Sequence, residues 1–164
     1  MIRKAKDKDL RAISDLAKKT RQHMLSIGLH QWLGDYPNIL HFKDDLKNDG
    51  LYVYETNHKI IASITILPEN DPPYKVIDWE KDDSLVIHRL FVDPDNQKQG
   101  IGQALFEQAK TLTKQGYQSL KVDTHPDNHR MQALIQKMNF KYKGYIESIN
   151  RLAYEWVCHD KEEV

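Results

Sequence analysis

The chain has 164 residues, of which 40% are hydrophobic, so it is long enough for one core of ordinary size and too short for a second domain. Lys and Arg together number 24, as do Asp and Glu, so the formal net charge is zero and no basic field favours nucleic acid or a membrane surface. The single cysteine, Cys158, excludes an internal disulfide, and no run of about eighteen apolar residues predicts a membrane helix. We therefore expect one domain over residues 1–164, located in the cytoplasm.

The first part of the chain predicts the element order strand, helix, helix, strand, strand. A short strand is expected over residues 2–5, and a helix with apolar residues at intervals of three or four follows it. A polar and aromatic loop over residues 30–37 leads to a second helix, which residues 48–50 end. Alternation over residues 51–55 and 59–67 predicts a hairpin.

Residues 68–84 form a long segment without periodicity that is rich in acidic residues and contains Tyr74 and Trp79. Loops of this length are uncommon in compact domains and often functional. One interpretation is a solvated acidic connector. The other is that the acids and the aromatic rings attract a cationic amine by electrostatic field and by cation–π contact. The sequence alone does not decide between them.

The stretch from residue 85 to residue 102 has the pattern strand, turn, helix. An apolar, β-branched run over residues 85–92 leads through a polar loop to Gly100 and Gly102, where helical periodicity begins. The first turn of a helix has amide N–H groups without intrahelical partners and the positive end of the helix dipole, so it attracts phosphate. Glycine lets a ligand approach these amides closely, and Lys98 adds a positive charge. The spacing differs from the dinucleotide and Walker patterns.

The rest of the chain predicts helix, strand, helix, strand, strand. The helix after the glycine loop ends at Gly116, and a strand over residues 119–124 follows. The two strands around this helix should be parallel, with a right-handed crossover. Another helix then precedes an antiparallel pair over residues 141–149 and 151–157, and residues 159–164 are expected to form a frayed tail.

Two segments resemble motifs of the Gcn5-related N-acetyltransferase (GNAT) family. Residues 97–102 are similar to its Q/R-x-x-G-x-G/A motif, which binds the pyrophosphate of acetyl-coenzyme A (acetyl-CoA), and the preceding strand is similar to the one that pairs with the pantetheine arm. Residues 128–140 resemble a second motif, N-x-x-A-x-x-x-Y-x-K-x-G-F, with Ile135 in place of the tyrosine that often protonates the departing thiolate. The resemblance implies that acetyl-CoA is the co-substrate and contacts Leu90, Phe91, Val92, Gln97, Lys98, Gln99, Gly100, Ile101, Gly102, Asn128 and Lys137.

The resemblance also implies a fold for the whole chain. We expect a mixed α/β architecture, the GNAT fold, with a central twisted sheet of roughly six to seven strands flanked by about four helices, in the order β-α-α-β-β-β-α-β-α-β-β. In this family, the strands that correspond to residues 86–92 and 119–124 splay apart at their carboxyl ends, and the thioester enters between them.

Acetyl transfer to an amine requires a neutral nucleophile, and an amine with a pKa near ~10.4 is almost fully protonated at pH 7. His88, on the central strand, is the first candidate for the base, and His125, after the next strand, is the second; either could instead be structural. Trp32, Tyr36 and Trp79 are candidate walls of the acceptor pocket, although aromatic side chains lie in cores more often than in ligand sites. The eight histidines show no spacing typical of a metal site.

These patterns predict an N-acetyltransferase that moves acetyl from acetyl-CoA to a primary amine of a small molecule, by direct transfer in a ternary complex. Two alternatives stay open. One is a non-catalytic acyl-CoA sensor, which Ile135 favours, and the other is a protein or peptide N-acetyltransferase, which differs only in its acceptor. The balanced charge argues against nucleic acid or membrane partners, and the sequence leaves open a homodimer formed through the C-terminal strands.

Overall fold

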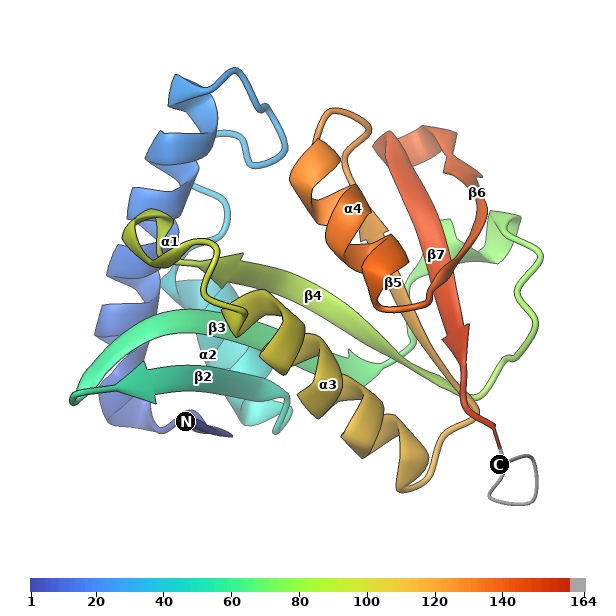
Figure 1. The fold of residues 1–164 in the computed structure, drawn as a ribbon, viewed down its shortest axis with the longest axis horizontal. Coiled ribbons are helices and arrows are strands. Elements are labelled where there is room, and N and C mark those ends of the chain that lie inside the picture. Colours follow the sequence, from blue (N-terminus) through green and yellow to red (C-terminus); the bar gives the residue numbers. More distant parts are fainter. Residues whose placement is uncertain (160–164) are drawn as a thin grey trace. The chain divides into compact units, whose positions relative to one another are not determined.

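The computed structural model describes residues 1–159, so residues 160–164 of the predicted tail lie outside the described residues. Helices and strands follow one another in the predicted order (Figure 1). The α-helices are α1 Leu10–Ser26, α2 Ile39–Lys47, α3 Ile101–Lys114 and α4 His129–Lys137. The strands are β1 Ile2–Lys4, β2 Leu51–Thr56, β3 Lys59–Pro68, β4 Ser84–Val92, β5 Ser119–Thr124, β6 Lys141–Ile146 and β7 Arg151–Val157. No described helix is both long enough and apolar enough to cross a membrane.

The strands form a seven-stranded sheet in the order β1-β2-β3-β4-β5-β7-β6. Strand β2 pairs antiparallel with β1 and β3, and β7 pairs antiparallel with β5 and β6. Strands β4 and β5 are parallel, with Ser84 opposite Ser119 and Val86 opposite Lys121, as the strand, helix, strand pattern predicts. The predicted mixed α/β fold is therefore confirmed, with seven strands and four α-helices in the described chain.

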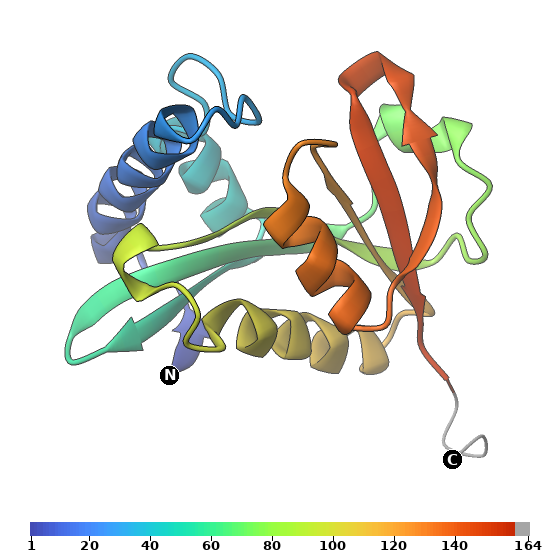
Figure 2. The ribbon, with the colours of Figure 1, turned by 45° about the horizontal axis from the view of Figure 1, so that its top comes forward.

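The described chain divides into two compact units, and β4 and α3 each contribute residues to both. The first unit comprises residues 1–67 and 88–105, and the second comprises residues 68–87 and the chain from residue 106 onward. In the first unit, α1 and α2 lie side by side (Figure 2). The organisation of residues 1–164 as one domain stays a prediction.

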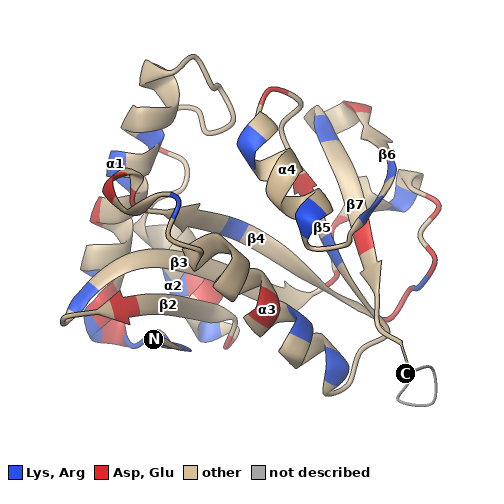
Figure 3. Ribbon diagram, viewed as in Figure 1, with Lys and Arg blue, Asp and Glu red and all other residues tan. Residues whose placement is uncertain are grey.

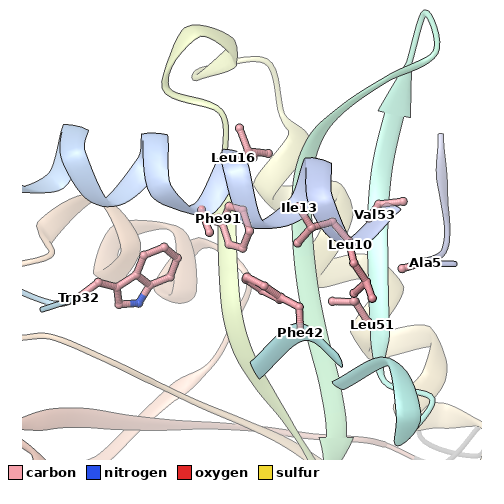
Figure 4. Close-up of a cluster of buried hydrophobic side chains, with 10 residues drawn as sticks. Ala5, Leu10, Ile13, Leu16, Trp32, Phe42, Leu51, Val53 and Phe91 are labelled. Carbon is pink, nitrogen blue, oxygen red and sulfur yellow. The ribbon is translucent and has the colours of Figure 1, made fainter. Parts of the chain in front are cut away.

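The core of the first unit forms because α1 and α2 bury one apolar face each against β2 and the end of β4. Ile13, Phe42 and Val53 are fully buried, and the Phe91 ring lies between Phe42 and Trp32 (Figure 4). Burying a side chain of this size stabilises the fold by about 1.5–3 kcal/mol. The end of β4 is therefore held in place by its own core side chain.

The hairpin before β7 departs from the prediction. Strand β6 ends at Ile146, and residues Glu147–Ile149 form a 3₁₀ helix instead of continuing the strand. Asn150 then reverses the chain with a left-handed φ of 54°, a conformation that asparagine tolerates better than most residues. The predicted strand over residues 141–149 is thus wrong at its end, because the reversal takes a helical turn before Asn150.

The acidic segment before β4 is anchored within the second unit through its backbone. It contains a 3₁₀ helix, Pro72–Val76, which lies beside β6. The buried carboxylate of Glu155, on β7, accepts hydrogen bonds from the N–H groups of Glu80 (2.8 Å) and Lys81 (3.2 Å) and from the Ser119 hydroxyl (2.7 Å). Most acidic residues of the segment are exposed, and Figure 3 shows acidic residues in red along this stretch of the ribbon.

Candidate functional site

The loop that follows β4 is fixed at its first residue, Asp93. The Asp93 N–H donates to the Ile61 carbonyl on β3 (2.7 Å), and its carboxylate accepts hydrogen bonds from the Lys19 ammonium (2.8 Å) and the Asp95 N–H (3.0 Å). Burial of the Asp93 side chain opposes its negative charge, but the bonds from Lys19 and Asp95 outweigh burial and hold the pKa of Asp93 below its ordinary value. The loop therefore starts from a rigid point.

Because Lys19 pairs with the Asp93 carboxylate, we expect Lys19→Met to lower the free energy of unfolding in a pH-dependent way. A carboxyl with a lowered pKa contributes stability above its unfolded pKa of about 3.9 and loses that contribution as the pH falls through its folded pKa. We expect Lys19→Met to reduce the free energy of unfolding by about 1 kcal/mol at pH 7, because it leaves Asp93 buried with one hydrogen bond fewer. The deficit should shrink as the pH falls from 7 towards the lowered pKa of Asp93, because protonation removes the negative charge that pairs with Lys19.

Urea titrations at pH 7 and pH 3 measure this effect. Lys18→Met is the matched control, because Lys18 neighbours Lys19 on α1 and its side chain is exposed. A deficit for Lys19→Met that is the same at both pH values would show that the ion pair with Asp93 does not anchor the loop.

The middle of the loop turns twice through left-handed backbone. The Gln97 carboxamide donates to the Val92 carbonyl (3.1 Å), which folds the loop back onto the end of β4. Lys98 and Gly100 have φ values of 65° and 77°, and both residues are exposed. A Cβ built on Gly100 meets no atom within 4 Å. Open space therefore lies in front of the backbone of Gly100.

The loop leads directly into the first turn of α3. The Ala104 N–H donates to the Gly100 carbonyl (3.0 Å) and closes this turn, so the amides of residues 101–103 precede the helix's own hydrogen bonds. These amides lie at the positive end of the helix dipole, directly after the left-handed residues Lys98 and Gly100. A phosphate or pyrophosphate fits such a site. The residues predicted to hold the coenzyme's pyrophosphate are thus brought together in this turn.

The residues predicted to face the pantetheine arm lie at the end of β4. Phe91 is 2% exposed, with its ring in the core of the first unit, whereas Leu90 and Val92 are half-buried. Since the Phe91 side chain is committed to the core, Phe91 offers a ligand only its backbone. The pairing of this strand's backbone with the pantetheine arm stays a prediction.

Two residues before Leu90, the predicted base His88 is half-buried on β4. Arg89, between them, has a left-handed φ of 46°, which interrupts the regular strand. The Arg89 guanidinium forms a two-point ion pair with the Asp45 carboxylate on α2, at 2.5 and 2.7 Å. Burial disfavours the charge on Arg89, but its hydrogen bonds to Asp45 and Tyr36 outweigh burial and raise its pKa.

Sequence reasoning missed this ion pair, although one signal was present. Asp45 lies three residues after Phe42 on a helix whose apolar residues recur at that interval, so the spacing places an acid on the buried face. A buried carboxylate needs a cation or several donors. No pattern in the sequence identifies Arg89, which lies 44 residues away, as that cation.

The two aromatic residues predicted on the loop between α1 and α2 have different environments. Trp32 is 5% exposed and belongs to the core, with its ring centroid 5.4 Å from that of Phe91. Tyr36 is half-buried, and its hydroxyl accepts a hydrogen bond from Arg89 (3.0 Å). The two rings meet edge to face at 6.5 Å. The Trp32 ring therefore packs in the core and fixes the loop there, whereas Tyr36 is the more accessible of the two residues.

In the second unit, the residues after β5 build the start of α4. The His125 ring is mostly buried, and its Nδ1 accepts the N–H of Asp127 (3.0 Å), so this nitrogen is the unprotonated one. The Asn128 carboxamide oxygen caps α4 by accepting the Met131 N–H (3.1 Å), while Lys137 is exposed in the last turn. His125 and Asn128, both predicted as site residues, thus have evident structural roles here.

The predicted pocket residue Trp79 lies against the β5 and β7 strands of the second unit. Its indole N–H donates to the Tyr74 carbonyl (2.8 Å), and the Lys121 ammonium lies 4.6 Å from its ring centroid. Burial lowers the pKa of Lys121. The Tyr74 hydroxyl donates a short hydrogen bond to Asp123, and burial is the main cause of the raised pKa of Tyr74. The cation that contacts Trp79 is therefore supplied by the protein itself.

Ile135, which replaces the motif's tyrosine, is fully buried. An aliphatic residue in the core cannot donate a proton, so this position packs and does not catalyse. In the described part of the chain, no group of three or more His, Cys, Asp or Glu side chains is arranged to hold a metal ion.

Comparison with known proteins agrees with the geometry. Residues 5–140 match the acetyltransferase (GNAT) family. The fold superposes with a TM-score of 0.87 on a GNAT-family acetyltransferase from Streptococcus agalactiae 2603, at 23% identity over 98% of this chain and 96% of that one. The fold also resembles the ribosomal-protein-S18-alanine N-acetyltransferase from Escherichia coli, with a TM-score of 0.70 and 17% identity over 100% of this chain and 97% of that one.

Two curated relatives match part of the chain. N-acetyltransferase 8 from Homo sapiens is 33% identical over 57% of this chain, and a UPF0039 protein from Schizosaccharomyces pombe is 30% identical over 59%. These matches span 39% and 57% of the relatives' own lengths. Since the family match covers most of the chain, and the seven-stranded sheet agrees with it, the chain belongs to the acetyltransferase (GNAT) family.

Proposed function

We propose that the protein transfers the acetyl group of acetyl-CoA to a primary amine of a small molecule, by direct transfer in a ternary complex. The observation that carries this proposal is the turn at Lys98 and Gly100, whose left-handed, exposed backbone leads into the free amides of α3. In this proposal, the pyrophosphate binds those amides, and Lys98 adds charge at the rim. The balanced charge and the single cysteine favour a cytoplasmic protein that acts without a nucleic acid or membrane partner.

The proposed chemistry assigns a separate task to β4. Neutralising a lysine-like amine at pH 7 costs roughly 4–5 kcal/mol, so a base near the amine accelerates the reaction. His88 is our candidate for this base. A backbone N–H of Leu90 or Phe91 would stabilise the negative charge that develops on the acetyl oxygen, a contribution worth roughly 3 kcal/mol in other enzymes.

The departing thiol needs little help from the protein. A thiol pKa near ~8.5 means that its thiolate is a good leaving group at neutral pH, so water or a surface tyrosine suffices as proton donor. Tyr142 and Tyr145, on β6, are exposed and are candidates for that donor. In this proposal, the buried Ile135 removes one proton donor of the family motif without preventing turnover.

Ile135 also supports a second candidate function. A protein that lacks the usual proton donor yet keeps the phosphate-binding turn is suited to sense acyl-CoA without catalysis. A peptide or protein acceptor is a further variant of the enzyme hypothesis, because the fold is shared with a ribosomal-protein acetyltransferase of Escherichia coli.

A thiol-release assay separates these functions. The purified protein is incubated with acetyl-CoA and a panel of polyamines, aminoglycosides, arylalkylamines, amino acids and short peptides, while calorimetry measures coenzyme binding. We expect binding and thiol release with one class of small amine. Release with peptides alone would favour a protein acceptor, and binding without release would favour the sensor. Absence of binding would overturn the proposed role of residues 97–102.

A further inference from the structure

Arg89 occupies an unusual position, because it is a half-buried cation on the strand that leads to the proposed coenzyme loop. Its side chain is 15% exposed and that of Asp45 is 3% exposed. The backbone of Arg89 is left-handed, a conformation that is energetically unfavourable for a residue with a Cβ. The ion pair with Asp45 helps to offset this cost, because it fixes the side chain at two points.

Both oxygens of the Asp45 carboxylate accept hydrogen bonds in this arrangement. Its Oδ1 accepts one bond from the Arg89 Nη2, and its Oδ2 accepts bonds from the Arg89 Nε (2.7 Å) and the Thr65 hydroxyl (2.7 Å). The network therefore joins α2, β3 and β4 of the first unit. A buried polar network whose members are all satisfied fixes one arrangement of the elements that carry it.

The third nitrogen of Arg89 extends the network to the loop between α1 and α2. Its Nη1 donates to the Tyr36 hydroxyl (3.0 Å). On the other side, Arg21 of α1 donates to the carbonyls of Tyr36 and Pro37 (3.3 Å each). The Tyr36 side chain is thus tied to β4, and its backbone is tied to α1.

We propose that Arg89 is a positioning residue that ties the acceptor loop, through Tyr36, to the strand on which the thioester is held. This inference rests on the proposed function, because it assigns the acceptor to the loop over residues 30–37. In this proposal, Arg89 acts through Tyr36 and not by direct contact with a substrate. It sets the position of Tyr36, and the acceptor binds to a loop that is already in place, so less ordering accompanies binding.

Tyr36→Phe tests the tie with little disturbance, because it keeps the ring and the Arg89–Asp45 pair and removes only the hydroxyl. Arg89→Lys keeps the positive charge but lacks the planar fork that reaches Asp45 and Tyr36 together. Tyr54→Phe, on β2 of the same unit, is the matched control, because Tyr54 is also half-buried. Hydrogen exchange of the peptide that covers residues 29–36 reports the order of the loop.

In the free protein, we expect Tyr36→Phe and Arg89→Lys to speed exchange in this peptide roughly tenfold, and Tyr54→Phe to leave it unchanged. With the amine identified by thiol release, both variants should raise the KM for the amine about tenfold, while the KM for acetyl-CoA and kcat stay within about twofold. The double variant should be no worse than either single variant, because both remove the same link.

Unchanged hydrogen exchange of the peptide over residues 29–36 in Tyr36→Phe would show that the Arg89–Tyr36 hydrogen bond does not order the loop. Faster exchange with an unchanged KM for the amine would show a merely structural bond and would overturn the positioning role. Failure of the wild-type protein to bind acetyl-CoA would remove the proposed function, and with it the positioning role, and the binding isotherm reveals that failure separately from the exchange data.

Discussion

Replacing Gly100 with glutamate is expected to abolish acetyl-CoA binding while the fold stays intact. A carboxylate at this position would face the pyrophosphate, and two like charges in contact repel strongly. The open space around the Gly100 Cβ means that the new side chain meets no protein atom within 4 Å at its base. We expect the dissociation constant to rise roughly 100-fold or more, a cost of about 2.7 kcal/mol. Isothermal calorimetry measures it, and circular dichroism checks the fold.

Strain in the left-handed backbone is the other way in which Gly100→Glu would weaken acetyl-CoA binding. Two control variants separate this strain from the effect of the charge. Gly100→Ala imposes the same left-handed strain, about 1–2 kcal/mol, without the charge. Gly28→Glu adds the same charge at a second glycine with left-handed φ (79°) and open space, outside both residues 97–102 and the loop over residues 30–37. We expect Gly28→Glu to bind acetyl-CoA as the wild type does and Gly100→Ala to lose less than tenfold. Equal affinity of Gly100→Glu and wild type would contradict a pyrophosphate site at this turn.

For His88→Gln, we expect kcat to fall about 100-fold at pH 7, within the range typical of a lost general base. The loss should diminish as the pH rises towards 10, because the acceptor amine then deprotonates without help. Glutamine keeps polarity and approximate size, so acetyl-CoA affinity should not change. Thiol release measured from pH 6 to pH 10, with the amine found in the panel, gives the profile.

Two further variants identify the histidine responsible. His125→Gln tests the second candidate, whose Nδ1 already accepts the Asp127 N–H and supports the start of α4. We expect it to lower stability more than turnover. His23→Gln, at an exposed position of α1, should change neither. If the rate of thiol release by His88→Gln follows the same pH profile as the wild type, at the same magnitude, His88 is not the base.

The sequence predicts the fold well because its signals are local. The apolar spacing on α1 and α2, the glycines at 100 and 116 and the β-branched run of β4 each report on residues within a few positions of one another. The left-handed turn at Lys98 and Gly100 belongs to this class, since a short motif encodes it. The strand, helix, strand unit then fixes the parallel pairing of β4 and β5.

The features that the sequence does not reveal depend on residues far apart in the chain. Asp45 pairs with Arg89, 44 residues away. The cation over the Trp79 ring is Lys121, which is also distant in the sequence. Trp32 lies on a polar loop, and only the packing of Phe91 against it shows that it belongs to the core. Local pattern cannot supply such pairings, because tertiary structure alone brings their members together.

The way in which Glu155 holds the acidic segment has an evolutionary consequence. Its carboxylate binds the N–H groups of residues 80 and 81, which every amino acid except proline possesses. Mutations to any residue except proline can therefore change the side chains at these two positions and still leave the backbone groups that bind Glu155. A lineage could vary the charge at this stretch of the surface by single substitutions while the scaffold beneath it stays constant, which makes the segment a natural place for directed evolution to begin.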